Sequence, residues 1–395
     1  MFNNEDLTID LWVDPPLLNA LFEDARSIAS KLNLTSVMSE INDLKAKISS
    51  RVRPVPNVSG SRYFTYAIDS SFPSSPLELV GGVLTVVAYG YVGQVGGKSD
   101  RYVTGDIVYE DTSEINRSIE ILSKIREREM VIRLLKDKLQ GRKNIDLIIL
   151  DGEIYIHPLP YNLPAYEGVR RKVEDVLERM LNLAEKSGTT IIGVVKRVRS
   201  RYFSVYAGHC LPINDKLTAS LILNKGEYIS LGNYGSLLPQ WLQVNYMDCE
   251  IKKGMSKEEA ERRLNEGIEN LRRVFNGDGG RLSGIPKIAD VELIFYKSPI
   301  TTVATKLEVL DLGGVGVPNI VGYLSSQTTN TGYPYLLDLV DTYVRVDSRL
   351  LDYVKTLLTR YAGSSVSDDN VRELINTLLQ LTNPQKAYLY RQMEG

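Results

Sequence analysis

The fold is decided by two stretches, Ala67-Ile68-Asp69-Ser70-Ser71 and Ile148-Ile149-Leu150-Asp151-Gly152-Glu153. In each stretch, an apolar run typical of a buried strand ends on an aspartate. Apolar strands rarely end on a carboxylate without a reason. The two aspartates are therefore the first candidates for a functional site.

The elements around these stretches follow a definite order. The apolar patterns predict strands over 63–69, 83–91, 102–109, 145–150 and 190–195, and helices over 114–139 and 165–186. The order is strand, strand, strand, helix, strand, helix, strand. It predicts an α/β fold with a mixed sheet and a ribonuclease H-like core, in which three antiparallel strands lead into parallel crossovers.

The remaining segments extend this core. We expect an N-terminal helical arm over 1–55, a main domain over 56–350 with an insertion around 205–285, and a C-terminal helical extension over 351–395. Apolar patterns after residue 200 are weaker. They predict strands over 241–246 and 291–296 and helices over 257–275, 335–360 and 366–379.

Composition excludes several classes of protein. The 395 residues are 43% hydrophobic and 24% charged, with a net charge of −2, which is ordinary for a soluble globular chain. No apolar run approaches the ~20 residues that span a bilayer, and the acidic N-terminus lacks the features of a secretory signal. We therefore expect a cytoplasmic protein that makes no membrane contact. Cys210 and Cys249 lie far apart and the chain has only two histidines. These counts exclude a cysteine zinc site, argue against zinc chemistry and argue against a disulfide.

Three carboxylates are candidates for a metal centre. Asp69 and Asp151 end the first and fourth strands of the core, and Glu129 lies in the helix between them, so all three would converge at one sheet edge. Hydrolysis of a phosphodiester needs an activated water and charge neutralisation, which two divalent cations ~4 Å apart supply. Carboxylates are the ligands that such hard cations prefer. Asp69 would bridge the two ions, and Glu129 and Asp151 would each hold one.

Other interpretations of these acids stay open. A single strand-end aspartate is often a helix cap or a turn former, and a turn is the default for Asp151-Gly152. Only one of Glu127 and Glu129 can face the sheet, because two residues turn a helix by roughly 200°. We choose Glu129.

A basic run follows the strand over 190–195. Lys196, Arg197, Arg199 and Arg201 could contact the phosphates of a nucleic acid, and the alternative is a solvated loop. Tyr202 and Phe203 could stack on an unpaired base, although aromatic residues after a strand more often belong to the core.

The ordered motifs resemble those of a known family. Tyr66 to Ser71, Asp146 to Glu153, Ile191 to Arg197 and Gly332-Tyr333-Pro334-Tyr335-Leu336-Leu337 together resemble the archaeal nuclease family NurA over about residues 60 to 347. The resemblance implies a manganese-dependent deoxyribonuclease with a ribonuclease H-like fold and two Mn²⁺ ions, with Mg²⁺ as an alternative. Such an enzyme cuts single-stranded DNA endonucleolytically and degrades DNA ends from 5′ to 3′. It also implies a homodimer that docks on a HerA-type hexameric helicase in DNA end resection and recombinational repair.

The resemblance also implies roles for particular residues. The family's catalytic acids would fall on Asp69, Glu129 and Asp151, and Tyr333 matches a tyrosine that would orient the scissile phosphate. The position of a family histidine is occupied by Asp341, which can also bind Mg²⁺ or Mn²⁺. Asp338, three residues earlier on the same helical face, is an alternative ligand.

Two further departures concern the aspartate motifs. The family often has Asp-Gly-Ser, where this chain has Asp69-Ser70-Ser71 and Asp151-Gly152-Glu153. Serine is small enough to be tolerated, and Glu153 could be an outer carboxylate or face away across the turn.

Two other functions remain open. The lost histidine would suit a catalytically weakened subunit that guides DNA in the same motor complex. An unrelated enzyme of ribonuclease H fold that acts on RNA/DNA hybrids is also compatible with this pattern.

Overall fold

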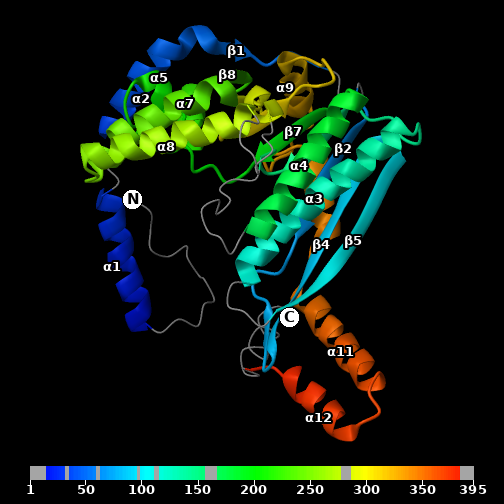
Figure 1. Ribbon diagram of the computed structural model, residues 1–395. Helices are drawn as coiled ribbons and strands as arrows, with labels where there is room; N and C mark the ends of the chain where they lie inside the picture. Colours follow the sequence, from blue (N-terminus) through cyan, green and yellow to red (C-terminus); the bar gives the residue numbers. More distant parts are fainter. Residues whose placement is uncertain are drawn as a thin grey trace.

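The computed structural model describes residues 15–31, 35–58, 63–95, 98–110, 115–155, 167–276 and 286–382. A large mixed sheet runs through this part of the chain, and helices cover it (Figure 1). The predicted mixed α/β class is confirmed. No helix in the described ranges has the length and apolarity needed to cross a membrane.

The sheet has ten strands in the order β1-β8-β9-β10-β7-β6-β2-β4-β3, and β5 also pairs with β4. The strands are β1 (Val52–Pro54), β2 (Thr65–Ser71), β3 (Leu77–Leu79), β4 (Gly82–Val95), β5 (Lys98–Glu110), β6 (Leu147–Asp151), β7 (Thr190–Val195), β8 (Glu227–Asn233), β9 (Glu292–Lys297) and β10 (Thr305–Leu310).

Strand direction changes along the sheet. β5, β4 and β2 are antiparallel neighbours, whereas β2, β6 and β7 are parallel. Beyond β7, the strands β10, β9, β8 and β1 continue in antiparallel pairs. β2 and β6 therefore lie near the middle of the sheet, and their carboxyl ends share one edge.

The helices are α1 (Pro15–Lys31), α2 (Thr35–Ile48), α3 (Ile115–Leu139), α4 (Glu167–Ser187), α5 (Phe203–Ala207), α6 (Asp215–Ile222), α7 (Tyr234–Val244), α8 (Lys257–Asn276), α9 (Val317–Ser326), α10 (Tyr335–Val344), α11 (Ser348–Ser364) and α12 (Asp369–Leu378). Three short helical turns, η1 (Ser49–Arg51), η3 (Asn245–Glu250) and η4 (Pro286–Asp290), join them.

Two apolar layers sandwich the sheet. On one face, α3 and α4 pack side by side over the central strands, with Val131, Leu134 and Leu177 buried (Figure 1). On the other face, α9 and α10 contribute Ile320 and Leu337 to a separate buried cluster. Strands β6 and β7 are covered on both faces, which fits their almost wholly apolar sequences before Asp151 and after Thr190.

The terminal helices differ in how they are held. Ile41, Leu44 and Ile48 of α2 are buried in the main core, whereas the described side chains of α1 are exposed. At the other end, α11 packs on β4 through a small cluster that includes Leu351 and Val354. The predicted helix over 335–360 is in fact two helices, because the chain turns at residues 345–347 between α10 and α11.

The prediction of a strand over 241–246 was wrong. These residues belong to α7 and the π-helical turn η3. The side chain of Asn233 caps the start of α7 by accepting a hydrogen bond from the Ser236 amide at 3.0 Å. This cap and the packing of Leu237 in the core favour a helix, although the apolar residues alone also suit a strand.

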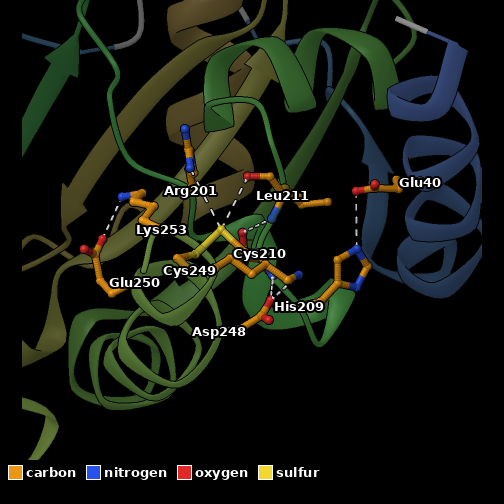
Figure 2. Close-up of a disulfide and its surroundings, with 11 residues drawn as sticks. Glu40, Arg201, His209, Cys210, Leu211, Asp248, Cys249, Glu250 and Lys253 are labelled. Atoms are coloured by element: carbon orange, nitrogen blue, oxygen red, sulfur yellow. Dashed lines mark hydrogen bonds and ion pairs between the residues drawn. A yellow bond between two sulfur atoms is a disulfide. The ribbon is translucent and has the colours of Figure 1, made fainter. Parts of the chain in front are cut away.

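The expectation against a disulfide was also wrong. Cys210 and Cys249 are joined, with their Cα atoms 5.1 Å apart (Figure 2). They are 39 residues apart in sequence, so their pairing depends on the packing of η3 against the segment after α5. The Asp248 carboxylate accepts a hydrogen bond from the Cys210 amide at 2.6 Å and reinforces this junction (Figure 2).

Candidate active site

The two aspartates lie at the same edge of the sheet. β2 and β6 are parallel and in register, with Ile68 opposite Leu150, so the next residue of each strand is Asp69 or Asp151. Asp69 is 4% exposed, and its Oδ1 accepts a hydrogen bond from the Ser70 amide at 2.7 Å. The predicted convergence of these two carboxylates is therefore observed.

The helix places Glu127 beside them. Glu127 is buried, and its Oε1 accepts a hydrogen bond from the Ser70 hydroxyl at 2.6 Å. The fully buried guanidinium of Arg128 pairs with the other carboxylate oxygen. Ser70 and Arg128 thus hold Glu127 at the sheet edge from two sides.

Glu129, the acid that the sequence analysis chose, does not join this group. Its side chain is 37% exposed and accepts a hydrogen bond from Arg126 at 2.6 Å, and Arg126 also binds Asp106 of β5. Two residues turn a helix by roughly 200°, so when Glu127 faces the sheet Glu129 faces outward. Glu127 therefore occupies the place beside the two aspartates that was predicted for Glu129.

Burial and crowding change the titration of the two aspartates. Burial, together with the negative charges of Asp151 and Glu127, raises the pKa of Asp69 to about 9, against the opposing effects of Lys196 and the Ser70 amide. Burial also raises the pKa of Asp151, where Lys196 opposes the effect and Glu127 adds to it. These carboxyl groups lie close to one another with too little positive charge among them.

Lys196 is the main counter-charge in this cluster. Its ammonium group donates a hydrogen bond to Asp151 Oδ2 at 2.6 Å. Burial disfavours the charge of Lys196, but the attraction of Asp151, with further help from Asp69 and Asp341, leaves its pKa raised. The predicted basic run therefore contributes a residue to the acidic cluster itself.

Tyr333 joins the cluster through a lysine that the sequence analysis missed. The Lys216 ammonium donates hydrogen bonds to the Tyr333 hydroxyl and to the Lys196 carbonyl, both at 3.0 Å. Lys196 also lies 5.3 Å from the centre of the Tyr333 ring. Lys216 comes from α6 in the insertion, and no motif in the sequence indicates that α6 reaches this edge.

The two aspartates of α10 have different surroundings. Asp341 is exposed and its charge acts on Lys196, so it faces the cluster side of the helix. Asp338 instead accepts hydrogen bonds from the hydroxyls of Thr329 and Thr331 at 2.5 and 2.9 Å. Asp338 therefore fixes the loop before α10.

The other predicted DNA-contacting residues are more dispersed. Arg197 and Arg199 are exposed beyond β7, whereas Arg201 is half-buried, with its guanidinium 3.9 Å from Cys210 Sγ (Figure 2). Phe203 is fully buried against Phe295, with ring centres 5.4 Å apart. It belongs to the core, so it does not offer a face for stacking on a base.

A buried network supports the turn that follows Asp151. Arg128 binds the carbonyls of Glu153 and Ile154, and Glu308 of β10 accepts a hydrogen bond from the Ile154 amide at 2.8 Å. Glu308 is fully buried and also accepts a hydrogen bond from the Tyr234 hydroxyl. Burial, followed by the charge of Glu308, raises the pKa of Glu153, which lies on this turn. The turn is thus fixed by residues distant in sequence.

The donor set suits a hard divalent cation. Asp69, Asp151 and Glu127 offer only carboxylate oxygens, which Mg²⁺ and Mn²⁺ prefer, and a cation would relieve the repulsion that raises the pKa of Asp69. In the arrangement described, no three acidic, histidine or cysteine side chains of the described segments already stand in metal-binding geometry. Lys196 instead neutralises Asp151.

Fold and site together define a mixed α/β protein whose central parallel strands end on a buried acidic cluster. The profile of the NurA domain matches residues 65–346, a range that contains strands β2 to β10 and covers most of the chain. The chain belongs to the NurA family. The resemblance carried by the sequence motifs is thereby confirmed.

Solved structures of NurA are among those that this chain matches. The NurA nuclease from Sulfolobus solfataricus is 15% identical, with a TM-score of 0.54, and the match covers 90% of this chain and 99% of that one. A crystal structure of NurA bound to dAMP and manganese is 11% identical, with a TM-score of 0.42, over 84% of this chain and 93% of that one. A comparison with curated proteins gave no match. At these identities the likeness concerns the fold.

Proposed function

We propose that this protein is a divalent-metal-dependent deoxyribonuclease with a ribonuclease H-like core. The observation that carries the proposal is the meeting of Asp69, Asp151 and Glu127 at one edge of the sheet in a chain of the NurA family. The strand order β5-β4-β2-β6-β7, with three antiparallel strands followed by two parallel ones, supports the ribonuclease H-like core.

The residues of the cluster divide the work of phosphodiester hydrolysis. Asp69, Asp151 and Glu127 would hold one or two cations, and a bound cation supplies an activated water and neutralises charge on the phosphate. Lys196 balances Asp151 in the protein without substrate. Asp341 is a further carboxylate on the same side, at the position of the family histidine.

Tyr333 and the lysines would position the substrate. Lys216 holds the Tyr333 hydroxyl at 3.0 Å, so the phenol has a fixed direction before DNA binds. Arg197 and Arg199 are exposed beyond the strand that leads to Lys196 and can contact phosphates further along the strand of DNA.

The metal is proposed to be manganese, with magnesium as the alternative. Carboxylate oxygens suit both ions, and one NurA crystal structure contains manganese. The test is digestion of end-labelled single-stranded DNA with Mn²⁺, Mg²⁺ or chelator. We expect cleavage with Mn²⁺ that Asp69→Ala and Asp151→Ala each abolish, while Glu129→Gln retains it. Cleavage that persists in chelator or in both alanine variants would refute the proposal.

The class of nucleic acid that is cut and the direction in which ends are degraded are tested with matched substrates. We propose endonucleolytic cutting of single strands and degradation of ends from 5′ to 3′. Single-stranded DNA, duplex DNA and RNA/DNA hybrid of one sequence, each labelled at either end, separate these activities. Cutting of the hybrid alone would favour the ribonuclease H-fold alternative.

We also propose that the protein acts as a homodimer with a HerA-type hexameric helicase in DNA end resection. Light scattering of the full chain, alone and with such a helicase, tests both associations. A second candidate is a DNA-guiding subunit of that complex, which the Lys196–Asp151 ion pair favours because it already occupies a carboxylate needed for metal. Inactivity with Mn²⁺ and partner present, together with retained DNA binding, would support this second candidate.

A further inference from the structure

Among the described residues, four cationic side chains lie around the acidic cluster, and three of them bind protein groups closely. Arg128 is fully buried against Glu127 and the turn after β6. Lys196 binds Asp151 at 2.6 Å, and Lys216 binds Tyr333 at 3.0 Å. Their charges are thus used to hold the protein's own groups together.

Lys124 is the fourth cation and is held far less tightly. Its ammonium lies 4.0 Å from Glu127 Oε2, which is too long for a hydrogen bond. The other contacts of Glu127, with Ser70 and Arg128, already satisfy that carboxylate. Within the described part of the chain, the Lys124 ammonium donates no hydrogen bond to a carboxylate.

The ammonium of Lys124 lies over the turn that carries Asp151. A Cβ atom built on Gly152 would be 3.1 Å from Lys124 Nζ, closer than a side chain and an ammonium normally approach. Gly152 has a φ of 112°, which only glycine adopts readily, so the turn both requires glycine and leaves space for the lysine. Lys124 therefore reaches across from α3 to the carboxyl end of β6.

Lys124 is also accessible to a ligand. Its side chain is 26% exposed, whereas that of Arg128 is 0% exposed. A partly exposed positive group whose ion pair with Glu127 is long, at 4.0 Å, can bind an incoming anion without first breaking a strong contact. The anion that this site would meet is a phosphate of the substrate.

We propose that Lys124 is a substrate-contacting residue that binds a phosphate of the DNA strand on the α3 side of the cluster. This inference rests on the proposed nuclease function. A lysine that binds a phosphate increases the salt dependence of DNA binding, because each phosphate that the protein neutralises releases counterions. That readout is independent of cleavage.

The experiment measures binding of a fluorescent single-stranded oligonucleotide to the full chain in chelator, over a range of salt. Loss of one phosphate contact should reduce the slope of log K against log salt by about 0.7. The same slope implies about eightfold weaker binding at 0.05 M salt. We expect these changes for Lys124→Gln and recovery of the slope in Lys124→Arg.

Lys136→Gln is the matched control. Lys136 is an exposed lysine of the same helix, 12 residues or about 18 Å further along, so its loss changes net charge equally. Thermal unfolding checks that each variant folds. A Lys124→Gln slope equal to that of wild type or of the control overturns the inference and leaves the nuclease proposal standing. A wild-type protein that shows no salt-dependent DNA binding overturns both.

Discussion

Asp69→Asn should stabilise the metal-free protein at high pH. Asp69 is buried, and its pKa is raised from 3.8 to about 9 by burial, then by Asp151 and Glu127. The folded state binds this proton more tightly than the unfolded state. The contribution of Asp69 to stability is therefore most favourable below pH 3.8 and is lost as pH rises toward 9. Asparagine removes the charge and keeps the oxygen that accepts from the Ser70 amide at 2.7 Å.

The size of the effect follows from these values. Each tenfold difference in proton affinity corresponds to about 1.4 kcal/mol. At pH 8 the folded protein still holds the proton of Asp69, whereas the unfolded chain, with a pKa of 3.8, has released it, so the cost of folding with this proton bound is at most about 6 kcal/mol. Local relaxation and entry of water lower this ceiling, and we expect about 2 to 3 kcal/mol. For a two-state chain of this length, that corresponds to a midpoint about 2 to 4 °C higher.

Calorimetry in chelator between pH 4 and pH 9 measures this prediction. The midpoints of Asp69→Asn and wild type should agree near pH 4 and diverge as pH rises. Glu129→Gln removes a half-buried carboxylate of the same helix that lies outside the acidic cluster, and it should show no such divergence. A difference between Asp69→Asn and wild type that is constant with pH, or that shrinks toward pH 9, would refute the reasoning.

Three further predictions concern the site and its support. Glu127→Gln should lower Mn²⁺-dependent cleavage of single-stranded DNA at least ~100-fold, and Glu129→Gln should lower it by less than ~3-fold, because only Glu127 lies beside the aspartates. Equal losses of cleavage in the two variants would contradict this placement. Reduction of the Cys210–Cys249 disulfide, which closes a loop of 39 residues, should lower the stability by about 4 kcal/mol. The thermal unfolding midpoint should therefore fall in dithiothreitol, and Cys210→Ser should show the same fall without reductant; an unchanged midpoint would argue against the bond. Gly193→Ala should lower both the unfolding midpoint and the rate of cleavage, because its Cβ would lie 2.6 Å from the backbone oxygen of Gly152 in the turn after β6. Wild-type values for both measurements would show that this turn is not tightly packed.

Local patterns were enough to find the central elements. The apolar runs ending at Asp69 and Asp151 predicted two covered strands, and both are buried strands of the sheet. The helix over 114–139 was predicted because apolar residues recur at helical spacing, and α3 spans Ile115–Leu139. Each of these features depends on residues that are neighbours in sequence.

Orientation of side chains on α3 was harder to predict. Glu127 and Glu129 are two residues apart, and helical periodicity shows only that one of them faces the sheet. Packing decides which one, because Ser70 and Arg128 bind Glu127, while Arg126, which also binds Asp106, holds Glu129 outward. Ser70 comes from β2 and Asp106 from β5, so no local rule identifies these partners.

The sequence by itself determined the α/β class, the family and the edge of the sheet where Asp69 and Asp151 meet, because strand ends and periodicity are local properties. Tertiary structure alone decided the rest of the site. It placed Glu127 rather than Glu129 beside the aspartates, brought Lys216 from the insertion to Tyr333 and joined Cys210 to Cys249. These contacts join segments 39 to 117 residues apart, or select one face of a helix, and depend on how whole elements pack.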